Sequence, residues 1–242
     1  MRWSAVAWML LFAVPRARAH AQAGPIYRAS WWDAASVGAA GALFVLPTVL
    51  DLPKGPPSCG STAPCDPATI PTVDRSALHT FSDGAGTAST ALLAGVAGLT
   101  AFASLQGLPA RQARGNFVML ANAAAWTAAS TEWLKAVIRR KRPVLYTSGA
   151  AAAVADRENQ ESLPSGHASL AFAAATSYLV LARRQHLPHR TRNAILLYAG
   201  AVGVSALRVA AGKHFPTDVA AGAALGSGIG WLSATVHPTI PD

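Results

Sequence analysis

The chain has 242 residues, and only 13% of them are charged, about half of the roughly 25% typical of soluble proteins. Hydrophobic residues make up 52%, and the formal net charge is +9. The arginines stand in short loops and form no continuous basic face interleaved with aromatic residues, so we expect no nucleic-acid partner. The composition instead favours a membrane protein, in which abundant alanine and glycine let helices approach closely.

The first residues resemble a secretory signal peptide. Arg2 precedes an apolar run over residues 3–14, and small residues in an A-x-A pattern follow it. We therefore predict a signal peptide or an uncleaved signal anchor over residues 1–23. Cleavage would leave the mature N-terminus outside, which conflicts with six full spans. The sequence leaves open whether the signal is cleaved and whether segment 34–50 crosses the membrane.

Six later segments are apolar and of roughly helix length, and no strand-like alternation competes with them. They cover residues 34–50, 88–105, 116–137, 167–182, 193–209 and 218–236. The pattern predicts an all-α, polytopic membrane bundle with five to six spanning helices. Residues 24–86 form an N-terminal segment with one apolar helix and a polar loop, and residues 87–237 form a helical catalytic core.

The polar loop contains the two cysteines of the chain, Cys59 and Cys65. Neither a histidine nor a second cysteine pair lies nearby, so we expect no zinc site. In an oxidising compartment the two residues would close a small disulfide loop, and otherwise they would be free thiols.

The connections 106–115 and 183–192 carry arginines and no acidic residue, which predicts that both are cytoplasmic. Helix parity then places the connections 139–163 and 210–217 outside. Three basic residues on that side, Arg139, Arg140 and Lys141, oppose the trend, and an anionic ligand would account for some of them. The alanine-rich patch 150–155 in the same connection suits a flexible lid or spacer.

Three polar clusters stand at these outside connections. Lys135 lies two helical turns before Arg142, so both cations face one side if the helix continues to the proline that ends it. Ser165 and Gly166 open another helix, whose free N–H groups and dipole form an anion site beside His167.

The third cluster holds Arg208, His214 and Asp218. A carboxylate one turn from an imidazole can orient the ring and make it a stronger nucleophile or base. Each cluster also has a structural reading: interfacial cations, a capped helix, or a surface His–Asp pair. Their occurrence together on one face favours a site that binds a phosphoryl group, attacks it and protonates the leaving oxygen.

The three clusters, in this order, resemble the signature of the type 2 phosphatidic acid phosphatase superfamily, which includes vanadium haloperoxidases. The resemblance covers roughly residues 88–236 and departs from the usual pattern at Leu207, where the family has serine. It implies that His214 forms a phosphohistidine, Asp218 orients it, and His167 protonates the leaving alkoxide. It further implies a phosphate site without metal or cofactor, made by Lys135, Arg142, Ser165, Gly166 and Arg208.

We therefore expect a metal-independent hydrolase of a lipid phosphate or diphosphate at the periplasmic face of a bacterial-type inner membrane. The alternatives are a soluble periplasmic acid phosphatase, a vanadate-dependent haloperoxidase, and a non-catalytic phospholipid-binding or translocating protein. Glu132 is expected to pair with Lys135 or Arg139, with a substrate role as the alternative. The charges of loop 156–161 are expected to be solvated. The sequence identifies neither the lipid nor the oligomeric state.

Overall fold

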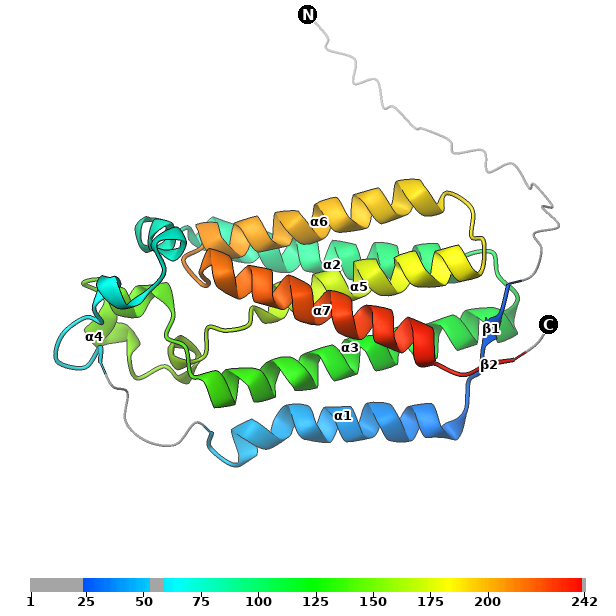
Figure 1. Ribbon diagram of the computed structural model, residues 1–242, viewed down its shortest axis with the longest axis horizontal. Coiled ribbons are helices and arrows are strands. Elements are labelled where there is room, and N and C mark those ends of the chain that lie inside the picture. Colours follow the sequence, from blue (N-terminus) through cyan, green and yellow to red (C-terminus); the bar gives the residue numbers. More distant parts are fainter. Residues whose placement is uncertain (1–23, 53–58, 241–242) are drawn as a thin grey trace, which may run out of the picture.

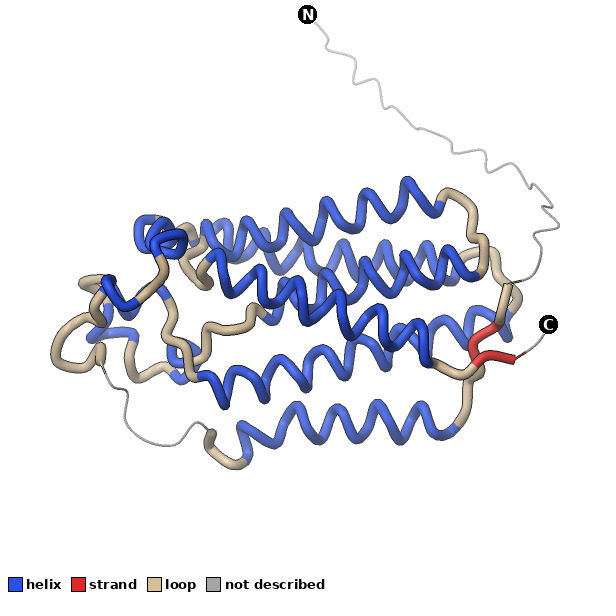
Figure 2. Tube along the Cα trace, in the orientation of Figure 1, coloured by secondary structure: helices blue, strands red, loops and turns tan. Residues whose placement is uncertain are grey.

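A computed structural model describes residues 24–52 and 59–240 of the chain, and the predicted signal segment 1–23 lies outside them. Long helices run side by side along one axis (Figures 1 and 2). They are α1 (Trp31–Val49), α2 (Asp83–Leu105), α3 (Ala110–Ile138), α5 (Gly166–Arg184), α6 (Arg190–Ala210) and α7 (Pro216–Val236).

The predicted all-α bundle and its helix order are confirmed, but several helices begin earlier than the apolar pattern indicates. Polar capping residues explain part of this difference. At α1, Ser30 and Asp33 form a capping box, and at α2 the Ser82 hydroxyl accepts from the Ala85 amide at 3.2 Å. Such capping residues fix the helix start ahead of the apolar run that hydropathy marks as helical.

Shorter elements occupy the connections. They are η1 (Pro67–Thr69), η2 (Thr72–His79), η3 (Pro143–Tyr146), α4 (Ala150–Ala153) and η4 (Arg157–Gln160). The patch 150–155, expected to be a flexible spacer, contains α4, and Ala150 is buried beside Leu145. At the other end of the bundle, β1 (Ile26–Tyr27) pairs with β2 (Thr239–Ile240) as an antiparallel ribbon.

Helix α5 is the centre of the bundle and packs against α2, α3, α6 and α7. Its contact with α7 is the most extensive, because three glycines of α7 face it. A Cβ atom at Gly226 would lie 1.9 Å from the Ser169 carbonyl oxygen, and one at Gly222 would lie 2.6 Å from that of Ser165. Only glycine permits this approach, which holds the first turns of α5 and α7 together.

Among the described residues, four helices are long and apolar enough to cross a membrane: α1, α2, α6 and α7. The sequence pattern predicts five to six spanning helices. Helix α5 is less apolar because its neighbours enclose it, so its serine and threonine side chains need not face lipid. Helix α3 carries buried polar residues such as Asn116, which donates to the Ser104 carbonyl at 2.8 Å.

The two ends of the bundle differ in character (Figure 1). The short α2–α3 and α5–α6 connections, which carry the arginines, lie at the end with the β ribbon. The long connections after α1 and α3 lie at the opposite end, with the α6–α7 turn. There, Cys59 and Cys65 form a disulfide, and the Cys65 amide donates to the Leu145 carbonyl at 2.8 Å. The disulfide loop is thereby attached to η3.

Candidate active site

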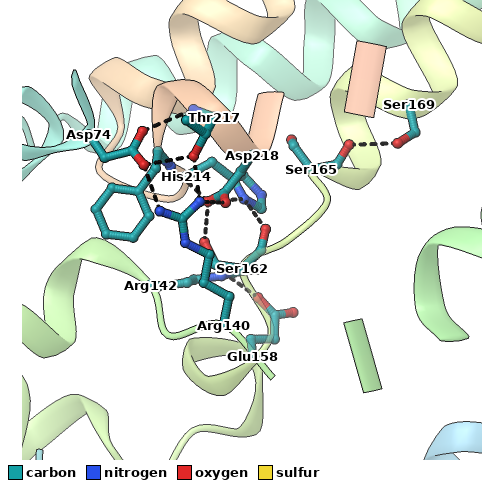
Figure 3. Close-up of polar contacts among 11 residues, drawn as sticks. Asp74, Arg140, Arg142, Glu158, Ser162, Ser165, Ser169, His214, Thr217 and Asp218 are labelled. Atoms are coloured by element: carbon teal, nitrogen blue, oxygen red, sulfur yellow. Dashed lines mark hydrogen bonds and ion pairs between the residues drawn. The ribbon is translucent and has the colours of Figure 1, made fainter. Parts of the chain in front are cut away.

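The candidate site lies at the end of the bundle that carries the long connections, around the first turns of α5 and α7 (Figure 3). The close packing of these two helices brings the second and third polar clusters together. The Ser165 amide donates to the Asp218 carbonyl at 3.0 Å, although the two residues are far apart in the chain. A backbone contact thus sets the position of the second cluster relative to the third.

His214 is buried, and its ring has a defined orientation. Nδ1 lies 2.8 Å from the backbone carbonyl oxygen of Ser162 and 3.7 Å from Oδ2 of Asp218. A carbonyl oxygen only accepts, so Nδ1 carries the proton and the lone pair is on Nε2. Burial lowers the pKa of His214 to about 3, which keeps the ring neutral near pH 7. The geometry therefore presents a neutral imidazole with an unprotonated Nε2.

Asp218 is fully buried and fixed by three donors. Its Oδ2 accepts from the Ser162 hydroxyl at 2.5 Å and from the Phe215 amide at 2.8 Å, and its Oδ1 accepts from Arg140 Nη1 at 2.5 Å. Figure 3 shows Arg140 between Asp218 and a second buried carboxylate, Asp74, whose Oδ2 lies 2.6 Å from Nη2. Asp218, the carboxylate near the histidine, thus belongs to an ion-paired set formed by Asp74, Arg140 and Asp218.

Two of the three predicted phosphate-binding cations pair with carboxylates. Lys135 Nζ lies 2.7 Å from Glu132, as expected, and Arg142 Nη1 lies 3.0 Å from Glu158. The expectation that Glu158 is a solvated loop charge is therefore wrong in part: its side chain is 73% exposed, but it contacts a buried arginine. The third cation, Arg208, is buried, with its Nη1 3.5 Å from the Ser89 hydroxyl.

Several buried polar atoms at this site have no hydrogen-bond partner among the described residues. They include Nε of Arg142, Nε of Arg208 and Oγ of Ser165. Buried polar groups are rarely unsatisfied, and each exception asks for an explanation. These three belong to residues that the sequence assigned to phosphate binding, and an oxyanion is the ligand that two guanidinium groups and a hydroxyl would accept.

The remaining predicted site residues also lie close by. A Cβ atom at Gly166 would be 3.8 Å from Lys135 Nζ, which brings the first and second clusters together. His167 Nε2 lies 3.1 Å from the Thr90 hydroxyl of α2. Lys135, Arg142 and Arg208 are near enough to His167 to interact with it electrostatically. The structure thus assembles all eight predicted residues at one end of the bundle.

Three participants were missed by the sequence reasoning: Asp74, Arg140 and the backbone carbonyl of Ser162. Only Arg140 was marked in the sequence, as a basic residue in a connection predicted to be outside. Its partners are internal carboxylates and not an external ligand. The described residues contain no group of three or more His, Cys, Asp or Glu side chains that could hold a metal ion.

Comparison with known proteins gives one match. The family model described as the PAP2 superfamily matches residues 116–242, just over half of the chain. All eight predicted site residues lie inside the matched range, whereas Asp74 lies outside it. Neither a curated protein nor a solved structure matches the chain significantly.

Proposed function

The chain belongs to the PAP2 superfamily, and from that premise we propose that it hydrolyses a lipid phosphate or diphosphate through a phosphohistidine on His214. Membership supports phosphoester hydrolysis in general. The observation that carries the finer proposal is the set of unsatisfied donors on Arg142, Ser165 and Arg208 beside a neutral, oriented imidazole. Binding alone would require the cations but not this histidine.

In the first step, Nε2 of His214 attacks phosphorus, and the bond from phosphorus to the lipid oxygen breaks. His167, in its protonated form, gives its proton to the leaving oxygen. The products are phosphohistidine and a lipid alcohol from a monophosphate, or phosphohistidine and a lipid monophosphate from a diphosphate. In the second step, water attacks phosphorus, the bond from phosphorus to Nε2 of His214 breaks, and His167 takes a proton from the water. Inorganic phosphate leaves, and both histidines return to their starting protonation states.

The charges around His214 and the phosphoryl group suit the attack by Nε2. The ring of His214 becomes cationic on phosphorylation, and its Nδ1–H faces the Ser162 carbonyl and the Asp218 carboxylate, both of which stabilise positive charge. Lys135, Arg142 and Arg208 would hold the phosphoryl oxygens as negative charge develops. Fixed charges in a site that excludes water usually supply the largest part of a rate enhancement.

A lipid substrate is supported by the four helices that are apolar enough to cross a membrane, which fit a multi-pass membrane protein. We propose that the site faces the periplasm of a bacterial-type inner membrane. The arginine-rich connections lie at the opposite end of the bundle, as the positive-inside rule requires. The disulfide between Cys59 and Cys65 lies at the same end as the site and suits an oxidising compartment.

The test is phosphate release from a panel of lipid phosphates and diphosphates in detergent, with EDTA present. Wild-type protein should release phosphate, and His214→Ala should release none while remaining folded. His79→Ala, which alters an exposed histidine on the same end, is the matched control and should behave as wild type. Equal release by His214→Ala would refute the nucleophile. Release from soluble phosphoesters alone, or halide oxidation with added vanadate, would refute the lipid substrate.

A further inference from the structure

The buried carboxylate of Asp74 is the feature that the proposed mechanism does not use. It comes from η2, in a segment outside the range matched by the family model, and its side chain is fully buried. Oδ1 accepts from the Thr217 amide at 3.0 Å, and Oδ2 accepts from the Thr217 hydroxyl at 2.7 Å and from Arg140 at 2.6 Å. A charge buried in this way is costly unless it is paired.

Arg140 connects this carboxylate to the reacting groups. One arm of its guanidinium binds Asp74, and the other binds Asp218 and the Thr217 hydroxyl. Its charged carbon also lies 4.5 Å above the ring of Phe215, the residue next to His214. A planar guanidinium held at three points has little freedom, so it fixes the carboxylate that it touches.

The charges of Asp74, Arg140 and Asp218 explain why the set contains two carboxylates. Arg140 alone would neutralise Asp218 and weaken its attraction for the cationic ring of phosphorylated His214. Asp74 offsets the charge of Arg140, so that the set of three carries one net negative charge next to the histidine. In the low dielectric of a buried site, this charge is felt strongly by the ring.

We infer that Asp74 and Arg140 are positioning residues of the reaction: together they fix Asp218 and preserve the negative charge that stabilises phosphorylated His214. Neither touches the phosphoryl group in this role. The inference rests on the proposed function. It also assigns the N-terminal segment a part in catalysis, since η2 supplies this charge from outside the matched range.

The experiment compares Asp74→Asn and Arg140→Gln with wild type on the best lipid phosphate found. For Asp74→Asn, kcat should fall about 10- to 100-fold, the loss typical of groups that orient reacting side chains. The inhibition constant of inorganic phosphate should stay within about twofold, because the three phosphate-binding cations are unchanged. Asp66→Asn changes an exposed carboxylate that caps η1 in the same connection. It is the matched control and should retain wild-type kcat.

The double variant, which combines Asp74→Asn with Arg140→Gln, separates a positioning role from a role in folding. If Asp74 acts through Arg140, adding Asp74→Asn to Arg140→Gln should cost much less than it costs in the wild type. Asp74→Glu, which keeps the charge but displaces the carboxylate, gives a second variant whose kcat should lie between those of wild type and Asp74→Asn. Purely additive losses, or unchanged kcat in folded Asp74→Asn, would overturn this inference and leave the proposed function standing. A wild type inactive on every phosphate ester would overturn the proposed function and this inference with it.

Discussion

The Nδ1 atom of His214 donates its hydrogen bond to the backbone carbonyl of Ser162, at 2.8 Å, and not to the carboxylate of Asp218, which is 3.7 Å away. The tautomer of the ring is therefore set by the main chain. The carboxylate contributes charge, and the two roles that a single aspartate has in a serine-protease triad are divided between two groups here.

This division predicts a mild effect for Asp218→Asn. Removal of the charge should lower kcat about 100-fold, whereas a loss that includes the wrong tautomer is nearer 10⁴-fold. The Ser162 carbonyl should keep the proton on Nδ1, which ¹⁵N NMR of labelled histidine can check. Ser162→Ala keeps the backbone carbonyl and removes only the hydroxyl that donates to Asp218. The kcat of this variant should therefore fall by less than that of Asp218→Asn. A ring that changes tautomer in Asp218→Asn would contradict the assignment.

A second prediction concerns stability at low pH. The pKa of His214 is about 3 in the folded protein and roughly 6.5 in an unfolded chain. Between these values the unfolded chain binds a proton that the folded protein does not, so stability falls as the pH drops below about 6.5. By pH 5 the loss from this histidine should be about 2 kcal/mol.

Thermal unfolding in detergent at pH 8, 6.5 and 5 measures this effect. His214→Gln, which does not titrate, should show a shallower decline of Tm with falling pH than wild type. His79→Gln removes an exposed histidine and should follow the wild-type curve. Identical pH dependence in wild type and His214→Gln would show that the buried histidine is not the group responsible.

A third prediction concerns the pair formed by Arg142 and Glu158. If Arg142 binds phosphate as proposed, the Glu158 carboxylate competes for its guanidinium. This carboxylate is largely exposed, and such pairs are worth at most about 1 kcal/mol. Glu158→Gln should therefore lower the inhibition constant of inorganic phosphate by up to about fivefold. Asp83→Asn, an exposed acid on the same end of the bundle, should change it little. Weaker phosphate binding in Glu158→Gln would mean that the glutamate assists the ligand.

A fourth prediction tests the contact between α5 and α7. Gly226→Ala places a methyl group where the Ser169 carbonyl stands, and the resulting separation of the helices should cost about 3 kcal/mol or more. Gly228→Ala lies on the same helix with nothing within 4 Å of the new atom. It should be neutral or stabilise by up to about 1 kcal/mol. Unfolding midpoints of the two variants in detergent make the comparison, and equal midpoints would refute the close packing.

A fifth prediction concerns the disulfide. Replacing Cys59 and Cys65 by serine should lower the free energy of unfolding by about 2 kcal/mol, as expected for so short a loop. The loop is attached to η3, which begins directly after Arg142, so the inhibition constant of phosphate should rise severalfold as well. Wild type treated with reductant should reproduce both effects. A change in stability without any change in phosphate binding would show that the loop does not support the site.

Much of the fold could be predicted because its strongest signals are local. Most of the long helices contain a long run of apolar residues, and the glycine at the start of α5 and the proline at the start of α7 mark where polar groups can face a ligand. The eight site residues stand within motifs of fixed spacing. Hydropathy was less informative for α5, because a helix enclosed by others can be polar without meeting lipid.

The parts of the site that could not be predicted depend on contacts between segments that are distant in the sequence. Asp74 meets Arg140 across 66 residues and Thr217 across 143, and no spacing in the sequence indicates such pairs. The partner of His214 is a carbonyl, which every residue possesses, so Ser162 carries no distinguishing side-chain signal for this contact. Glu158 looked like one of several charges in a loop, and only the fold brings it to Arg142.

The distance along the chain between Asp74 and Thr217 has a consequence for biogenesis. A ribosome makes η2 well before the start of α7, so the ion-paired set around Arg140 can close only after the start of α7 has been made. His214, the proposed nucleophile, lies in the turn directly before α7. The candidate site therefore cannot assemble in a nascent chain before α7 has been made.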